Sequence, residues 1–175
     1  RIWPVNERDL LAVEDDAPTG VHFMRAAESE RSERVLSRGG VPYYAYRDTA
    51  MSRTAPFRPE WISELVTVNG ANPDDTQVEW NNGHFLHQFT YFIGPVNFYY
   101  IDNSKRSVAE MFTGDSMYIT PFVPHTFTTR STPEGRRGLI IALTFGSKLM
   151  KDGRQELSVL DIEKLRHCLP SSSTG

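Results

Sequence analysis

The sequence has a single cysteine, Cys168, and no long run of apolar residues. One thiol cannot form a disulfide within the chain, which fits a reducing compartment, and Cys168 falls near the end of an expected helix, where a structural role is commoner than a nucleophilic one. No stretch has the length and apolarity of a membrane span, and the first residues lack the pattern of a signal peptide. We therefore expect a cytoplasmic protein without a membrane partner.

The sequence also lacks a large excess of charge of either sign. Nineteen basic residues face 22 acidic ones, the formal net charge is −3, and no basic run stands out, which argues against a nucleic-acid partner. The sequence has no Gly-x-Gly-x-x-Gly fingerprint for a dinucleotide and no internal repeat. These absences leave one globular domain, for which 175 residues are enough to fill a core.

Short strands separated by turn residues dominate what is present. The apolar and aromatic runs predict strands at Tyr43–Asp48, Ile62–Val68, Gln77–Trp80, Phe89–Ile93, Phe98–Ile101, Val108–Phe112, Ser116–Thr120, Thr126–Arg130 and Leu139–Phe145. Good helix formers predict one helix at Met24–Ser37, and an apolar stripe with an N-cap serine predicts another at Ser158–Leu169. The pattern is typical of a mainly β jelly-roll or cupin-like barrel with flanking N- and C-terminal helices.

The chain divides into three parts on this interpretation. Residues 1–40 are a helical and extended lead-in, residues 41–147 the barrel, and residues 148–175 a C-terminal helix followed by a linker. The first residue is Arg1, and the last six residues, from Pro170, are typical of a linker or tail. We expect a domain that belongs to a longer chain.

Three side chains suggest a metal centre: His84, Gln88 and His125. Residues on a strand alternate between its faces, so a strand through this segment would point His84 and Gln88 the same way and His87 the opposite way. His125 follows the next predicted hairpin. Two imidazoles and one oxygen donor on one face leave positions open for substrate and O2, as in non-haem Fe(II) oxygenases. The amide of Gln88 would bind through its carbonyl oxygen and bring no charge.

A simpler interpretation stays open, because a histidine in a strand is more often a surface or core residue than a ligand. The second motif weighs toward the metal, since Gly114, Pro121 and His125 have the spacing of the second cupin motif. The first motif is looser, with Gln88 where cupins carry glutamate.

Four segments together resemble the phosphonate-processing cupins: Asn72-Pro73-Asp74-Asp75, Asn81-x-Gly83-His84, Gly114-x-Ser116-Met117 and Val123-Pro124-His125-x-Phe127. This family contains hydroxypropylphosphonate epoxidase, 2-hydroxyethylphosphonate dioxygenase and methylphosphonate synthase. The resemblance runs from about Arg38 to Phe145 and implies an Fe(II)-dependent, O2-consuming enzyme that acts on a small phosphonate. Because all electrons would come from the substrate, it implies no 2-oxoglutarate and no flavin.

The third ligand separates the three enzymes within this resemblance. The epoxidase has a glutamate four residues after the first histidine, where this chain has Gln88, and the dioxygenase has one six residues before the second histidine, where it has Ile119. Neither carboxylate is present, which is similar to methylphosphonate synthase, with two histidines and one glutamine. The expected reaction is therefore cleavage of 2-hydroxyethylphosphonate to methylphosphonate, with the dioxygenase and epoxidase reactions as alternatives.

The resemblance also implies phosphonate contacts at Arg38, Tyr44, Tyr46 and Asn81, and makes Tyr46 and Asn81 the candidate catalytic residues. Arginine, hydroxyl and amide donors suit the oxygens of a phosphonate dianion. Each residue has a plainer interpretation, because Asn81 could form a turn, the tyrosines could pack a barrel face and Arg38 could cap a helix.

The resemblance also bears on the expected partners of the chain, and other functional classes stay open. The family takes a lysine from the helical domain of a neighbouring subunit, which suggests a homo-oligomer, and no lysine of this sequence matches it. A ligand-binding cupin without turnover, such as the sensor domain of a regulator, and an isomerase-type cupin with another divalent metal remain alternatives.

Overall fold

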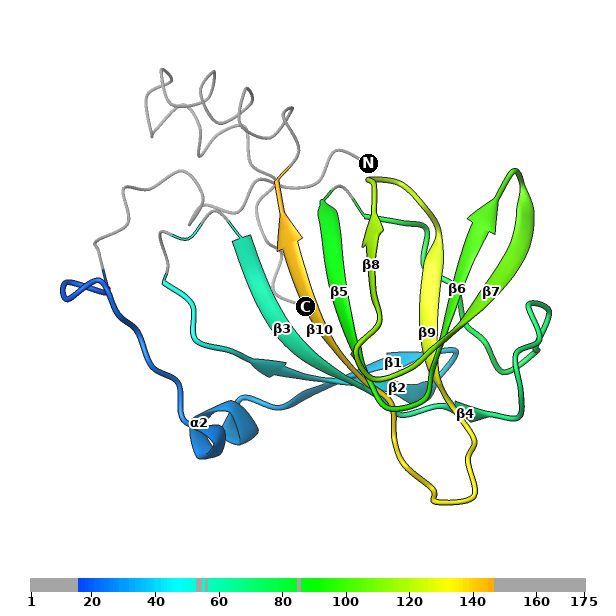
Figure 1. Cartoon of the computed structure of the whole chain (residues 1–175), viewed down its shortest axis with the longest axis horizontal. Helices are drawn as coiled ribbons and strands as arrows, with labels where there is room; N and C mark the ends of the chain where they lie inside the picture. The colour runs from blue at the N-terminus through cyan, green and yellow to red at the C-terminus, as the bar shows by residue number, and fades with distance from the viewer. Residues whose placement is uncertain (1–15, 53–54, 56, 85, 147–175) are drawn as a thin grey trace, which may run out of the picture.

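The chain folds into two curled, mainly antiparallel sheets that face each other (Figure 1). The computed structural model describes residues 16–52, 55, 57–84 and 86–146. The elements are α2 Ala26–Arg31, β1 Arg34–Arg38, β2 Val41–Asp48, β3 Phe57–Glu64, β4 Thr67–Val68, β5 His87–Ile93, β6 Val96–Asp102, β7 Lys105–Met111, β8 Ser116–Ile119, β9 His125–Arg130 and β10 Leu139–Phe145. The expected mainly β barrel is therefore confirmed.

Strand order places distant segments side by side. The larger sheet has the order β1-β2-β3-β10-β5-β8, and the smaller one has β4-β9-β6-β7. All pairs are antiparallel except β4 with β9. The last strand, β10, thus lies in the middle of the larger sheet, between β3 and β5, because its apolar sequence from Leu139 to Phe145 suits a position with a neighbour on each side.

The core lies between the two sheets. Phe92 and Ile140 of the larger sheet and Val96 of the smaller one are fully buried in one cluster, and the rings of Phe92 and Phe127 lie 6.1 Å apart across the interior. Burial of such side chains is the main favourable term in folding. Since register partners on neighbouring strands share a face, the inner face of every strand can be assigned from these core residues.

The expected helix at Met24–Ser37 is only partly correct. The helix α2 ends at Arg31, and Arg34–Arg38 forms strand β1, which pairs with β2 from Arg34 opposite Tyr46 to Arg38 opposite Val41. Local helix propensity was a weak guide here, because pairing with β2 gives the backbone N–H and C=O groups of β1 hydrogen-bond partners, whereas the end of an isolated helix leaves such groups unpaired.

The expected strand at Gln77–Trp80 is wrong. Side chains, and not a neighbouring strand, hydrogen-bond to the backbone of this segment. Asp75 Oδ1 accepts from Gln77 N at 2.9 Å, and Tyr43 Oη accepts from Glu79 N at 3.1 Å. Asn and Asp compete with strand ladders in this way. Val78 is nevertheless buried, in a second cluster with Val68 and Tyr99.

Two expectations lie outside the described residues, namely the helix at Ser158–Leu169 and the role of Cys168. Within the described part of the chain, no helix has the length and apolarity needed to cross a membrane.

Candidate functional site

His84 and Gln88 meet as the sequence predicted, though by a different local structure. Strand β5 begins only at His87, so His84 lies in the irregular segment before it. Its backbone carbonyl accepts from Phe122 N at 2.9 Å, and its ring Nε2 lies 3.0 Å from Gln88 Oε1. The loop, and not the alternation of a strand, brings the two side chains together.

The protons on His84 and Gln88 can be assigned from their other contacts. His84 Nδ1 lies 2.7 Å from Leu86 O, which only accepts, so Nδ1 carries the hydrogen and Nε2 presents a lone pair. The amide of Gln88 donates through Nε2 to Thr90 Oγ1 at 2.8 Å, which turns Oε1 toward His84. Two acceptor atoms therefore face each other in a largely buried place.

His125 completes the set from the opposite sheet, at the first residue of β9. Its Nδ1 donates to Val123 O at 2.8 Å, so its Nε2 also presents a lone pair, and its ring centroid is 5.0 Å from that of His84. Burial lowers the pKa of His125 to about 4, which keeps the imidazole neutral near pH 7. A neutral imidazole is the form that binds a metal.

This donor set fits a divalent cation. Lone pairs of His84 Nε2 and Gln88 Oε1 repel at 3.0 Å unless a positive charge stands beside them, and the ring of His125 lies next to the ring of His84. No group of three His, Cys, Asp or Glu side chains able to hold a metal occurs among the residues that the structure describes. A metal at this position would therefore depend on the amide of Gln88.

Asn81 braces both loops of the site. Its Oδ1 accepts from Gly83 N at 2.8 Å and from His125 N at 2.9 Å, and its Nδ2 lies 3.2 Å from His125 Nε2. The turn interpretation of this asparagine is thus part of the structure. Because His125 Nδ1 donates to Val123 O, Asn81 Nδ2 donates to the lone pair of His125 Nε2, which is the atom that a metal ion would use.

Gly83 is required where the two loops touch. Its φ is +78°, and a Cβ at this position would lie 2.6 Å from the backbone carbonyl carbon of Phe122. Phe122 itself has a φ of +67°, which is uncommon for an aromatic residue. Strained backbone of this kind tends to collect at functional sites.

Ile119 lies directly opposite Gln88 in the pairing of β8 with β5, and is 3% exposed. The two side chains therefore share the inner face of the sheet. A carboxylate at either of these two positions would point into the same interior region.

Some of the side chains expected to contact the phosphonate already form hydrogen bonds within the protein, and others keep donors for a ligand. Tyr44 is buried, and its hydroxyl lies 2.8 Å from Thr126 Oγ1 and accepts from Phe127 N at 2.9 Å. Arg38 Nη1 donates to Glu79 O at 3.0 Å and Thr126 Oγ1 at 3.3 Å, and its guanidinium lies over the Tyr44 ring. The packing interpretation thus describes Tyr44, whereas Arg38 retains further N–H donors.

Tyr46 is the available hydroxyl. It lies on the inner face of β2, opposite Ile62, and the described residues give its hydroxyl no hydrogen bond. Burial raises its pKa to about 12, so the hydroxyl stays protonated and can donate to an anion. The positive charge of Arg38 opposes that shift and acts on His125 as well, which places Arg38 near both groups.

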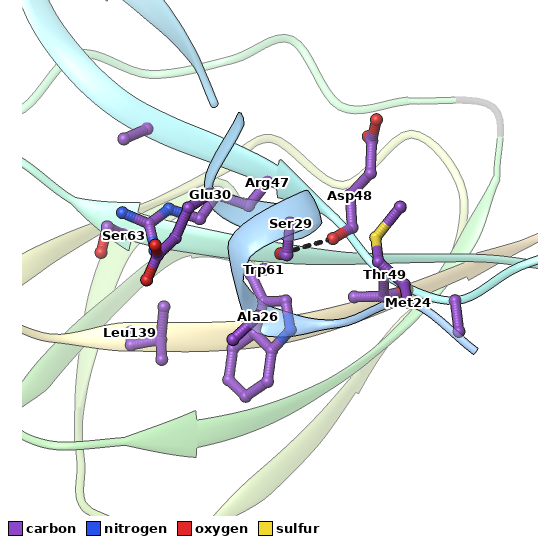
Figure 2. Close-up of a pocket in the computed structure, with 12 residues that line it drawn as sticks. Met24, Ala26, Ser29, Glu30, Arg47, Asp48, Thr49, Trp61, Ser63 and Leu139 are labelled. Carbon is purple, nitrogen blue, oxygen red and sulfur yellow. Dashed lines mark hydrogen bonds and ion pairs between the residues drawn. The ribbon is translucent and has the colours of Figure 1, made fainter. Parts of the chain in front are cut away.

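A separate cavity of about 490 Å³ lies on the outer face of the larger sheet, between α2 and strands β2 and β3 (Figure 2). It contains none of the predicted site residues. Two of its polar side chains are engaged with the protein, since Ser29 Oγ donates to Asp48 O at 2.7 Å and Arg47 pairs with Glu33 at 2.7 Å. We therefore place the site in the barrel and not in this cavity.

Sequence reasoning missed Thr90 and Phe122. Thr90 could have been found, because it follows Gln88 by two residues on a strand and must share its face. No signal in the sequence indicated that Phe122 supports the loop of His84, since the contact joins segments far apart in the chain.

Curated proteins similar to this chain include two phosphonate enzymes, and no family model matches it. Methylphosphonate synthase of Nitrosopumilus maritimus (strain SCM1) is 60% identical over 163 residues, which are 93% of this chain and 35% of that protein. The (S)-2-hydroxypropylphosphonic acid epoxidase of Streptomyces wedmorensis is 30% identical over 92 residues, 52% of this chain and 44% of the enzyme. The chain thus spans less than half the length of either relative.

Solved structures agree with this relationship. Streptomyces albus HEPD with 2-hydroxyethylphosphonate and Fe(II) bound has a TM-score of 0.77 and 48% identity, over 97% of this chain and 38% of that one. An Fe(II) complex of HppE with substrate has a TM-score of 0.62 and 26% identity, over 75% of this chain and 64% of that one.

Proposed function

We infer that this chain, a member of the phosphonate-processing cupins, forms the Fe(II) centre of a methylphosphonate synthase that converts 2-hydroxyethylphosphonate to methylphosphonate with O2. Similarity to methylphosphonate synthase over 93% of the chain supports the enzyme. The HEPD structure, with 2-hydroxyethylphosphonate and Fe(II) bound, supports the substrate and the metal. Because the chain spans about a third of each of these proteins, the activity is proposed for the protein that contains it.

The observation that carries the proposal is the pair Gln88 and Ile119. They face each other on adjacent strands, at the two positions where the resemblance expects the carboxylates of the epoxidase and the dioxygenase. Gln88 turns a neutral oxygen toward His84, and Ile119 offers no ligand atom. We propose that His84, Gln88 and His125 hold the iron.

Fe(II), when bound, would supply open coordination positions and the one-electron chemistry that O2 requires. The side chains around it would bind and orient the substrate. Tyr46 and the remaining donors of Arg38 suit the phosphonate oxygens, and Asn81 Nδ2 lies beside the metal position, 3.2 Å from His125 Nε2. Tyr44 would support this group through Thr126 without touching the substrate.

The product distinguishes this function from its runner-up. HEPD is 48% identical over nearly the whole chain, so formation of hydroxymethylphosphonate and formate is the second candidate. We expect the full-length, Fe(II)-loaded protein under O2 to give methylphosphonate from 2-hydroxyethylphosphonate, measured by phosphorus NMR. Hydroxymethylphosphonate as the main product would instead assign a dioxygenase.

A matched pair of variants tests the ligand argument behind the product. Gln88→Glu and Ile119→Glu each place one carboxylate on the same interior face, from opposite strands. We expect both to tighten Fe(II) binding, because a charged donor replaces or joins a neutral one, and to change the ratio of products. Unchanged affinity and product in both variants would show that these positions do not govern the metal.

We also propose a homo-oligomer, because the resemblance implies a lysine that reaches the site from a neighbouring subunit, and a cytoplasmic location, which the single cysteine suits. Mass determination in solution tests the assembly, and mixing inactive variants of different subunits tests the shared site.

A further inference from the structure

A row of cross-strand neighbours connects the candidate metal position to solvent. Along the larger sheet, Ile119 of β8 lies opposite Gln88 of β5, Gln88 opposite Thr144 of β10, and Thr144 opposite Arg58 of β3. Register partners in antiparallel strands share a face, so all four side chains belong to the inner face of the barrel. Arg58 therefore stands in line with a candidate metal ligand although it lies 30 residues away in sequence.

Exposure increases along this row. Ile119 and Gln88 are 3% and 5% exposed, Thr144 is half-buried, and the Arg58 side chain is 57% exposed. Neighbouring strands lie about 4.8 Å apart, so the backbones of Arg58 and Gln88 are about 10 Å apart. The row thus runs from the interior of the barrel to its rim, where it ends at the cationic side chain of Arg58.

Ion pairs at the rim leave most of the Arg58 guanidinium uncommitted. Arg58 Nη2 lies 3.3 Å from Glu60 Oε1, and this oxygen is shared with Arg34, which also pairs with Asp48 at 2.8 Å. Arg34 thus contacts both carboxylates, while Arg58 has one shared contact among the described residues, and these two arginines and two carboxylates together carry no net charge. Five N–H groups in a planar fork make arginine a good partner for a phosphonate.

We propose that Arg58 is a substrate-recruiting residue, which attracts a small alkyl phosphonate dianion to the rim of the barrel on the side of His84, Gln88 and His125. The proposal rests on the proposed function. It adds a second cationic residue to Arg38, which lies at the strand β1 side of the site and is already bonded to Glu79 and Thr126. Recruitment by an exposed charge is screened by salt, which gives it a measurable signature.

The test compares Arg58→Gln with Arg106→Gln in the full-length, Fe(II)-loaded protein. Arg106 is a close match, because it is 54% exposed and has one ion pair, to Asp74 at 3.5 Å, but it lies on β7 of the other sheet. We expect Arg58→Gln to lower kcat/KM for 2-hydroxyethylphosphonate about tenfold at low salt, and less at about 0.3 M salt. Turnover at saturation, kcat, and iron content should be unchanged, and Arg58→Lys should recover the salt dependence.

Three outcomes would overturn the role of Arg58. These are equal kcat/KM in the two glutamine variants, a loss that salt does not reduce, and a fall in kcat with KM unchanged. Failure of the proposed function would be distinct, since the unaltered protein would then not turn over 2-hydroxyethylphosphonate. Anaerobic calorimetric titration with the same phosphonate would still compare the two variants in that case, and equal affinities would again overturn the proposal.

Discussion

The two ends of the barrel interior solve the same electrostatic problem in different ways. At one end, His84 Nε2 and Gln88 Oε1 face each other at 3.0 Å as two acceptors, and the His125 ring lies beside them. At the other end, Glu64 at the end of β3 is fully buried, and neither carboxylate oxygen has a hydrogen-bond partner among the described residues. Acceptors without donors are costly in an interior, so each end needs a positive species. A metal ion suits the first, and a proton suits the second.

The surroundings of each group decide whether a metal ion or a proton neutralises the lone pairs there. Glu64 lies opposite Tyr44 on regular strands within the apolar core, and burial raises its pKa well above the usual value. His84 lies half-buried in the irregular segment before β5, and His125 is buried at the start of β9, with their Nδ1 atoms held by the carbonyls of Leu86 and Val123. The comparison shows that a buried polar group by itself does not identify a site. Convergent lone pairs near an opening are more informative.

The largest effect should come from removing an imidazole. We expect His84→Ala or His125→Ala to abolish Fe(II) retention and turnover, because a single imidazole and one amide would remain. His87→Ala is the control, since His87 stacks on Phe145 on the outer face of β5. Iron content after desalting measures the effect. A His125→Ala protein with full iron and activity would break the comparison between the two ends.

Substrate donors should rank next. Loss of a hydrogen bond to a charged group costs about 1.5–3 kcal/mol, or roughly ten- to a hundredfold in affinity. We expect this for Asn81→Ala and Tyr46→Phe, measured as the Michaelis constant for 2-hydroxyethylphosphonate. Tyr91→Phe, on the outer face of β5, is the control. Wild-type kinetics in both variants would make these residues scaffold only.

Gly83→Ala should loosen the metal end alone. The new Cβ would lie 2.6 Å from the Phe122 backbone, whereas Gly70→Ala, at a φ of +73° against +78°, meets nothing within 4 Å. Both changes carry the cost of a positive φ, on the order of 1 kcal/mol. We expect weaker Fe(II) binding only in Gly83→Ala. Equal iron affinity in the two variants would remove the Gly83–Phe122 contact from the account.

The smallest effect concerns Glu64 and is a dependence of stability on pH. The raised pKa means that Glu64 keeps its proton in the folded protein at pH values above 4.5, the ordinary pKa, where the same group in the unfolded chain has lost it. Stability is therefore lost as pH rises from that value toward the folded pKa. Glu64→Gln should flatten this loss, seen as a Tm advantage that grows between pH 4.5 and 7, at about 2–4 °C per kcal/mol. A constant Tm difference would show that Glu64 is not protonated.

Much of the barrel could be predicted from the sequence, because its strands carry their own signals. Leu139–Phe145 was predicted to the residue, as an apolar run between turns. The segment after Arg31 could not be, since its pairing with β2 is a tertiary contact that outweighs helix propensity.

The sequence indicated the residues of the candidate site but not the way in which they come together. Spacing and resemblance indicated His84, Gln88 and His125, and the structure brings them together. What brings His84 next to Gln88 is a loop that packs at Gly83 against Phe122, and not the alternation of side chains along a strand. Arg58 could not be found from sequence, because its relation to Gln88 depends on the order of β3, β10 and β5 in the sheet.

The central claim is that one Fe(II) is held by two imidazoles and one neutral amide. A crystal structure of the iron-loaded protein, with an anomalous difference map at the iron edge, tests it most directly. The account predicts one iron peak in contact with His84 Nε2, Gln88 Oε1 and His125 Nε2. A peak with Gln88 turned away, or with a carboxylate in its place, would contradict the account.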